Sequence, residues 1–79
     1  MHIILNGTKK LFQEPLTLEK LLEQLQLDKR KLAVERNREI VPKPEFGLIN
    51  LCDGDEIEIV HFIGGGAYSL QRESNDIDK

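Results

Sequence analysis

The chain of 79 residues has little cysteine, no long apolar run and no surplus of basic charge. A single cysteine, Cys52, excludes an internal disulfide framework and a cysteine cluster for zinc. No apolar run is long enough to span a membrane, and the start MHIILNGTKK lacks the length and cleavage site of a signal peptide. The net charge of −3 gives no footprint for nucleic acid. We therefore expect one cytoplasmic domain without a nucleic-acid or membrane partner.

A hairpin is predicted at the start of the chain. The run HIILNG ends in Asn6-Gly7, a pair that tolerates the positive φ angles of a type I′ turn. Successive apolar residues at 3–5 predict a strand buried on both faces, and hence central in a sheet. TKKLFQ then predicts the returning strand, which Pro15 ends.

One amphipathic helix follows the hairpin. Thr17 is a residue type favoured at the helix N-cap. Four leucines at i, i+3, i+4 and i+7 form one apolar stripe, which predicts a helix of about three turns. The stripe consists of Leu18, Leu21, Leu22 and Leu25. We expect it to pack on apolar residues of the predicted strands, namely Ile3 or Leu5, Val34, Ile57 and Ile59.

The remaining pattern completes a two-layer domain. KLAVERN predicts a strand, the prolines of IVPKPEFG predict a loop, DGD predicts a turn and EIEIVHFI predicts the final strand. The order is hairpin, helix, strand, irregular run and strand. This order predicts an α+β fold of the β-grasp (ubiquitin-like) kind, a mixed sheet of about four to five strands with one main helix on one face.

No catalytic or metal-binding constellation is recognisable in the sequence. His2 and His61 have no cysteine or carboxylate cluster at metal-ligand spacing. Asp53 and Asp55 lack the rest of a calcium loop, and a plain turn explains them better. Cys52 lies in an apolar run, which favours a small buried hydrophobe over a reactive thiol.

Three glycines, Gly64, Gly65 and Gly66, follow the last strand directly. No Lys-Ser or Lys-Thr pair follows, so the run is no phosphate loop. The residues alone leave two interpretations open. The run is either a flexible linker to a following domain or a thin tail that threads a narrow enzyme cleft, since glycine has no Cβ. We expect the polar segment 67–79 to be a disordered extension, because it has too little apolar surface to offset the entropy of ordering.

Alternation in the last strand predicts a docking surface. Ile57 and Ile59 fall on one side, and Val60 and Phe62 fall on the other. If the isoleucines face the helix, the other pair faces water. Exposed apolar residues are ordinary in isolation. Their position just before the glycines is what favours contact with a partner protein.

Several stretches resemble the ThiS/MoaD group of ubiquitin-like sulfur carriers. The matching pieces are IILNG, TLEKLLEQL, LAVERNREIVP and DGDEIEIVHFIGGG, which together cover residues 1–66. VERNREIVP and IEIVHFIGGG are similar to ThiS, the carrier of thiamine biosynthesis, more than to MoaD, the molybdopterin-synthase carrier. Members of both families normally end at the glycines. This chain departs from that pattern because it continues to Lys79.

The resemblance implies a carrier and co-substrate, not an enzyme, with no bound cofactor. A ThiF-like activating enzyme using ATP and Mg would adenylate the terminal glycine. A persulfide donor would convert it into a thiocarboxylate, and a ThiG-like thiazole synthase would accept the sulfur. In this sequence Gly66 would carry the thiocarboxylate and Gly64 and Gly65 would form its flexible approach. Phe62 and Ile63 would anchor the exit from the sheet, and Val60 would join them in contacting the partners.

Alternatives to this function remain open in the sequence. The carrier could serve another acceptor, such as molybdopterin, cysteine, homocysteine or tRNA, or the domain could be a non-catalytic β-grasp interaction module. Segment 67–79 could be a precursor peptide removed by a processing protease, the stump of a fused neighbour, or an artefact. Adenylation needs a free carboxylate. We therefore expect the chain as written to be inactive, and cleavage between Gly66 and Ala67 to activate it.

Overall fold

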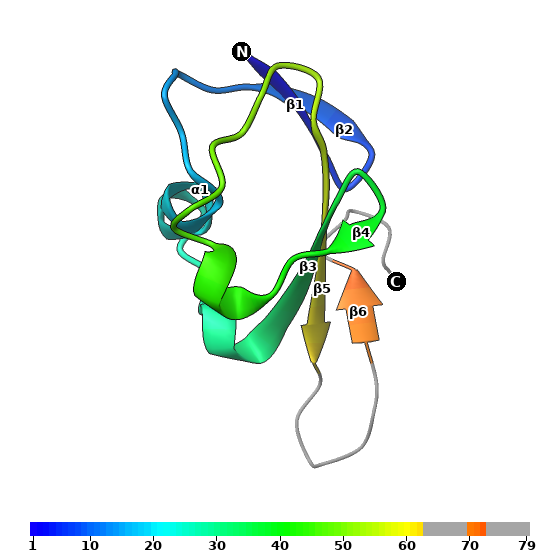
Figure 1. The fold of residues 1–79 in the computed structure, drawn as a ribbon. Coiled ribbons are helices and arrows are strands. Elements are labelled where there is room, and N and C mark those ends of the chain that lie inside the picture. Colours follow the sequence, from blue (N-terminus) through cyan, green and yellow to red (C-terminus); the bar gives the residue numbers. More distant parts are fainter. Residues whose placement is uncertain (63–69, 73–79) are drawn as a thin grey trace.

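The computed structural model describes residues 1–62 and 70–72 (Figure 1). In these ranges a sheet of six strands carries one α-helix on one face. The elements are β1 (His2–Leu5), β2 (Thr8–Leu11), α1 (Leu18–Gln24), β3 (Leu32–Arg36), β4 (Glu39–Ile40), β5 (Glu56–Phe62) and β6 (Leu70–Arg72), with short 3-10 helices at Lys29–Lys31 and Lys43–Glu45. Among these residues no helix is long and apolar enough to cross a membrane.

The sheet is mixed, with strand order β2-β1-β5-β3-β4. β1 and β5 are parallel, whereas the pairs β1–β2, β3–β4 and β3–β5 are antiparallel. A parallel pairing of the first strand with the last long strand requires a crossover, and α1 lies in that crossover. This arrangement confirms the predicted α+β, β-grasp fold.

The opening hairpin forms with the predicted turn, but β1 differs from expectation. Asn6 and Gly7 have φ angles of 47° and 84°, as a type I′ turn requires. Ile3 and Leu5 are buried, whereas Ile4 is only half-buried. The prediction of burial on both faces is wrong because a helix covers one face only. The central strand is β5, and β1 lies beside it.

The helix starts where predicted and ends earlier. The hydroxyl oxygen of Thr17 accepts a hydrogen bond from the backbone N–H of Lys20, at 3.1 Å. α1 has 7 residues, about two turns rather than the predicted three. Leu25 is its C-cap, and Gln26 then takes a left-handed φ of 60°, which stops the helix.

The core lies between α1 and the inner face of the sheet. The buried residues include Ile3, Leu5, Leu18, Leu21, Leu22, Val34, Ile57 and Ile59, as predicted. Leu25 packs at the edge of this cluster and is only partly buried. Loops add Leu16, Phe46 and Leu51, which the sequence pattern did not indicate.

The irregular run between β4 and β5 closes the start of the helix. The carbonyl oxygens of Ile49 and Phe46 accept hydrogen bonds from the N–H groups of Leu18 and Glu19, at 3.1 and 2.9 Å. These are two of the donors that the first turn of a helix leaves without an internal partner. The predicted loop therefore fixes α1 on the sheet as well as connecting two strands.

β6 lies in the segment that we expected to be disordered. Its residues 70–72 run antiparallel to β5, with Arg72 opposite Val60 and Leu70 opposite Phe62. For these three residues the structure gives a strand where the sequence favoured disorder. Ile63 and the three glycines lie outside the described residues. A domain boundary at Gly66 stays a prediction.

Candidate docking site at the end of the last long strand

The predicted alternation of β5 is present in the structure. Ile57 and Ile59 are 1% and 0% exposed and face α1. Val60 is half-buried, and Phe62 is 45% exposed on the opposite face. The two residues therefore lie on the open face of the sheet, at the end of β5 that leads to the glycines. Their contact with a partner stays a prediction.

A lysine from another part of the chain lies against Phe62. The Nζ atom of Lys43 is 5.5 Å from the centre of the Phe62 ring. At an exposed site this cation–π contact contributes about 0.5–1 kcal/mol. It places a positive charge beside Phe62, two residues before the first glycine in the sequence. Sequence reasoning missed Lys43 because the contact joins residues far apart in the chain.

Apolar and acidic side chains share the open face. Paired residues of neighbouring strands lie on the same face of a sheet. The β3–β5 register sets Ala33 opposite Val60 and Glu35 opposite Glu58. Ile40 of β4, which is 64% exposed, lies opposite Glu35. The face thus presents apolar residues beside carboxylates, a surface suited to a partner with apolar and basic groups.

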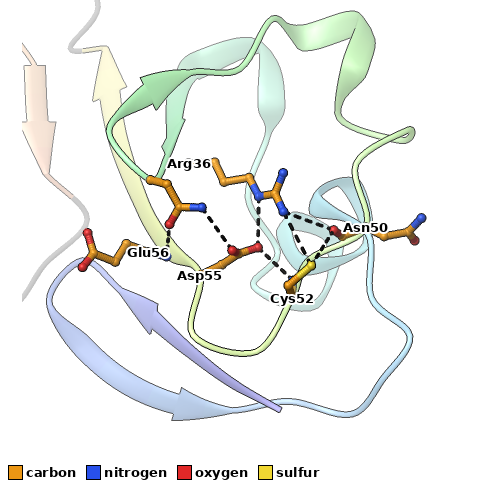
Figure 2. Close-up of polar contacts among 6 residues, drawn as sticks. Arg36, Asn50, Cys52, Asp55 and Glu56 are labelled. Carbon is orange, nitrogen blue, oxygen red and sulfur yellow. Dashed lines mark hydrogen bonds and ion pairs between the residues drawn. The ribbon is translucent and has the colours of Figure 1, made fainter.

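The opposite end of β5 is held by a polar network around Asp55 (Figure 2). One carboxylate oxygen accepts hydrogen bonds from the Arg36 Nε–H at 3.0 Å and from the Cys52 backbone N–H at 2.8 Å. The other accepts from the Asn37 side-chain amide at 3.1 Å. The Asn37 oxygen in turn accepts from the backbone N–H of Glu56 at 2.9 Å. The network ties β5 to the turn after β3.

The environment of Asp55 keeps its carboxyl group ionised. Burial alone would raise the pKa of Asp55, since it disfavours the charged form. The hydrogen bonds from Cys52, Asn37 and Arg36, with the charge of Arg36, outweigh burial and hold the pKa below its ordinary value. Asp55 is therefore a structural carboxylate, which agrees with the turn predicted for this segment.

Cys52 does not have the buried position that we predicted. It is exposed, with its sulfur 3.8 Å from Nη2 of Arg36 and 3.9 Å from the backbone oxygen of Asn50. Its neighbour Leu51 is 6% exposed and takes the inward position. The extended chain directs successive side chains to opposite sides, so Cys52 turns outward.

Asn6 has a second role that sequence reasoning missed. Its side-chain nitrogen donates to the backbone oxygen of Ile59 at 3.3 Å, and its side-chain oxygen accepts from the Ile59 N–H at 2.7 Å. The Asn6 backbone N–H donates to the backbone oxygen of Ile57 at 2.8 Å. The amide group thus replaces a strand residue and extends the β1–β5 pairing past the end of β1.

The side chain of His2 lies beside the carboxylate of Asp53. His2 donates its backbone N–H to the Asp53 carboxylate at 2.6 Å, and its ring nitrogen is 3.9 Å from the same oxygen. Over the described ranges no three residues of the His, Cys, Asp or Glu type are grouped to hold a metal ion. The Asp53 carboxylate accepts from the backbone N–H of His2 in β1, and the Asp55 carboxylate accepts from that of Cys52 within the turn.

The chain is similar to known carrier proteins over nearly all of this fold. The model of the ThiS family matches residues 3–66. The sulfur carrier protein ThiS of Bacillus subtilis is 50% identical over 50 residues, which cover 63% of this chain and 76% of that protein. A thiazole synthase of Paramagnetospirillum magneticum is 49% identical over 67 residues, 85% of this chain but 21% of the relative. The chain therefore spans about a fifth of that thiazole synthase's length.

A solved structure shares the architecture. The crystal structure of the thiamine biosynthesis protein ThiS from Geobacter metallireducens matches with a TM-score of 0.73 and 30% identity. The match covers 84% of this chain and 100% of that protein. Together with the family model, the fold and the position of β5 before a glycine run, this shows that the chain belongs to the ThiS family.

Proposed function

We propose that this domain is a sulfur carrier of thiamine biosynthesis, working in the cytoplasm as a co-substrate of other enzymes. The observation that carries the proposal is the ThiS family match, which runs through the whole β-grasp domain to Gly66. The exposed end of β5 supports it, because a carrier needs a recognition surface next to the group that it delivers. The domain itself performs no catalysis.

The chemistry requires a free carboxylate at the last glycine. A carboxylate is a poor electrophile at neutral pH. A ThiF-like enzyme with bound MgATP would let the Gly66 carboxylate oxygen attack the α-phosphorus, with pyrophosphate leaving. A persulfide sulfur then displaces AMP, and a thiol cleaves the resulting S–S bond to leave a glycyl thiocarboxylate. Gly64 and Gly65 provide a backbone without side chains that can enter a narrow cleft.

The open face of the sheet is our proposed contact for the partner enzymes. Val60 and Phe62 supply its apolar part next to the tail, with Ile63 as the following residue. Glu35 and Glu58 add negative charge. A ThiG-like thiazole synthase is the proposed sulfur acceptor, and two relatives named thiazole synthase support this choice because each contains a segment similar to this chain.

Segment 67–79 makes processing a part of the proposal. With Ala67 attached, the Gly66 carbonyl belongs to an amide and cannot be adenylated. We propose that a protease cleaves between Gly66 and Ala67.

A mass measurement tests this function. The full chain and a chain ending at Gly66 are each incubated with a ThiF-like enzyme, MgATP and a persulfide source. We expect the shorter chain alone to gain the mass of one oxygen-to-sulfur exchange. An equal mass gain in the uncleaved chain would refute the role of Gly66. No mass gain in either chain with several activating enzymes would favour a β-grasp interaction module.

A second candidate is a carrier domain joined to its own acceptor. The match to the Paramagnetospirillum thiazole synthase covers 21% of that protein, so a carrier-like segment and a larger part occur in one chain there. Residues 67–79 would then be a link to a following domain. The mass of the protein isolated from its source cells separates the candidates: a chain ending at Gly66 indicates processing, and a much larger chain indicates fusion.

A further inference from the structure

The two edges of β5 are covered differently. Along one edge β3 pairs with β5 from residue 57 to residue 61. Along the other edge β1 pairs only with Glu56 and Ile57, because β1 ends at Leu5 and turns into the hairpin. The second half of β5 therefore extends beyond the end of β1 (Figure 1).

The hydrogen bonds show which peptide groups face this second edge. The backbone oxygens of Asp55 and Ile57 accept hydrogen bonds from the backbone N–H groups of Ile4 and Asn6. The backbone N–H and oxygen of Ile59 both form hydrogen bonds with the side-chain amide of Asn6. The backbone oxygen of Glu56 instead accepts from Asn37, on the β3 side. Because the peptide groups of a strand alternate, the next pair directed to the β1 edge belongs to His61.

β6 covers this part of the edge. Gln71 lies opposite His61, and the strand runs antiparallel to β5. β6 thus prolongs the row of pairings that β1 and the Asn6 amide begin. β6 follows the glycine run in the sequence, and it pairs with β5, the strand that precedes the glycines.

We propose that β6 is an in-chain blocking strand. It occupies the edge of β5 at Val60–Phe62, and an extended segment of the adenylating enzyme pairs with this edge once residues 67–79 are removed. The proposal rests on the sulfur-carrier function. Main-chain hydrogen bonds at a sheet edge give affinity for extended segments of many sequences. A strand held on the same chain competes at high effective concentration. Cleavage after Gly66 ends this advantage and opens the edge of β5, which precedes the new carboxylate in the sequence.

Amide hydrogen exchange tests the block without any partner. The proteins are the full chain, the full chain with Gln71→Pro and a chain ending at Gly66. Proline removes the N–H and is poorly tolerated in a pairing strand. We expect the His61 amide to exchange about tenfold faster or more in the two altered proteins, the size expected for losing one hydrogen bond. The amide of Val60, which faces β3, is the internal control, and Asn75→Pro is the matched variant outside β6. Equal exchange of His61 in all of them would overturn the proposal.

Binding to a ThiF-like enzyme without ATP tests the competition. The full chain and its Gln71→Pro variant both end at Lys79, so neither has the glycine carboxylate. We expect Gln71→Pro to bind about tenfold tighter than the full chain or Asn75→Pro. In those two proteins the enzyme must displace β6 and exchange one strand pairing for another, whereas in the variant the edge is open. Equal affinities would overturn the block. If the chain ending at Gly66 accepts no sulfur while Gln71→Pro still binds more tightly, the carrier function fails and the blocking strand stands.

Discussion

The two ends of β5 differ in what surrounds them. At the start, the carboxylate of Asp55 and the amide of Asn37 bond neighbouring backbone and side chains, and Ile57 is buried. At the other end, Phe62 is 45% exposed and has the ammonium group of Lys43 over its ring. This difference predicts that the start of β5 serves stability and that its end serves recognition. Changes at its start should act on folding, and changes at its end should act on partners.

The largest effect is expected for Ile57→Ala. Ile57 is 1% exposed, so truncation leaves a cavity between α1 and the sheet. The free energy of unfolding should fall by about 2–5 kcal/mol, measured by urea denaturation. Ile40→Ala, at a position that is 64% exposed, is the control and should change it by less than about 0.5 kcal/mol. Similar losses for both variants would contradict the assigned faces.

Asp55→Ala should have the next largest effect. It removes the carboxylate that accepts hydrogen bonds from Arg36, Asn37 and the Cys52 N–H. These partly buried donors then lose their acceptor. We expect a loss of about 1–3 kcal/mol in the same measurement. Asp53→Ala should cost less, because the Asp53 side chain is 69% exposed. A loss at Asp53 that matched the loss at Asp55 would mean that the network does not hold this end of β5.

The same carboxylate predicts how stability depends on pH. The folded pKa of Asp55 is lowered, so the unfolded chain takes up the proton first as pH falls. Its contribution is fully present above the ordinary pKa of about 3.9 and is lost as pH drops through the lower folded value. Unfolding measured between about pH 6 and about pH 3 should therefore show decreasing stability.

The pH experiment needs one background change. Hydrogen bonds from the Arg30 side chain and backbone N–H lower the pKa of partly exposed Asp28 to about 2, so the folded-state pKa of Asp28 is lowered in the same direction as that of Asp55. Asp28→Asn removes that group. Adding Asp55→Asn should then make the dependence on pH less steep. A profile that keeps its slope would exclude Asp55 as a source of acid sensitivity.

The smallest effect on stability is expected for Phe62→Asp. The side chain lies on the open face, so the free energy of unfolding should fall by no more than about 1 kcal/mol, the size of the lost contact with Lys43. Adenylation or sulfur transfer by the partner enzymes should weaken in a chain ending at Gly66, as measured by pyrophosphate exchange. Leu11→Asp on β2, at a position that is 70% exposed, is the matched control away from this end. Unfolding of Phe62→Asp would mean that Phe62 belongs to the core.

Local patterns in the sequence predicted most of the elements. The Thr17 cap, the Asn6-Gly7 turn and the leucine stripe depend on residues close together in the chain, and all three are present. The order of strands depends on distant pairing, so β1 was wrongly placed at the centre. Phe46 reaches the core from a loop that has no periodic pattern.

The candidate site was only partly predictable for the same reason. The alternation of β5 gave the orientation of Val60 and Phe62. The contacts of Lys43 with Phe62 and of Asn6 with Ile59 join segments far apart in the chain. Cys52 was misplaced because an apolar run indicates burial on average, whereas the direction of each side chain depends on the local backbone.

The position of β5 also bears on how the domain folds. β1 and β3 both pair with β5 and not with each other, so the centre of the sheet is supplied late in the chain. Contacts between distant segments slow folding, since loop closure must precede them. A nascent chain that stops before residue 56 has two strand edges and no strand to join them, a state prone to aggregation. The sheet should therefore be completed only once β5 has left the ribosome.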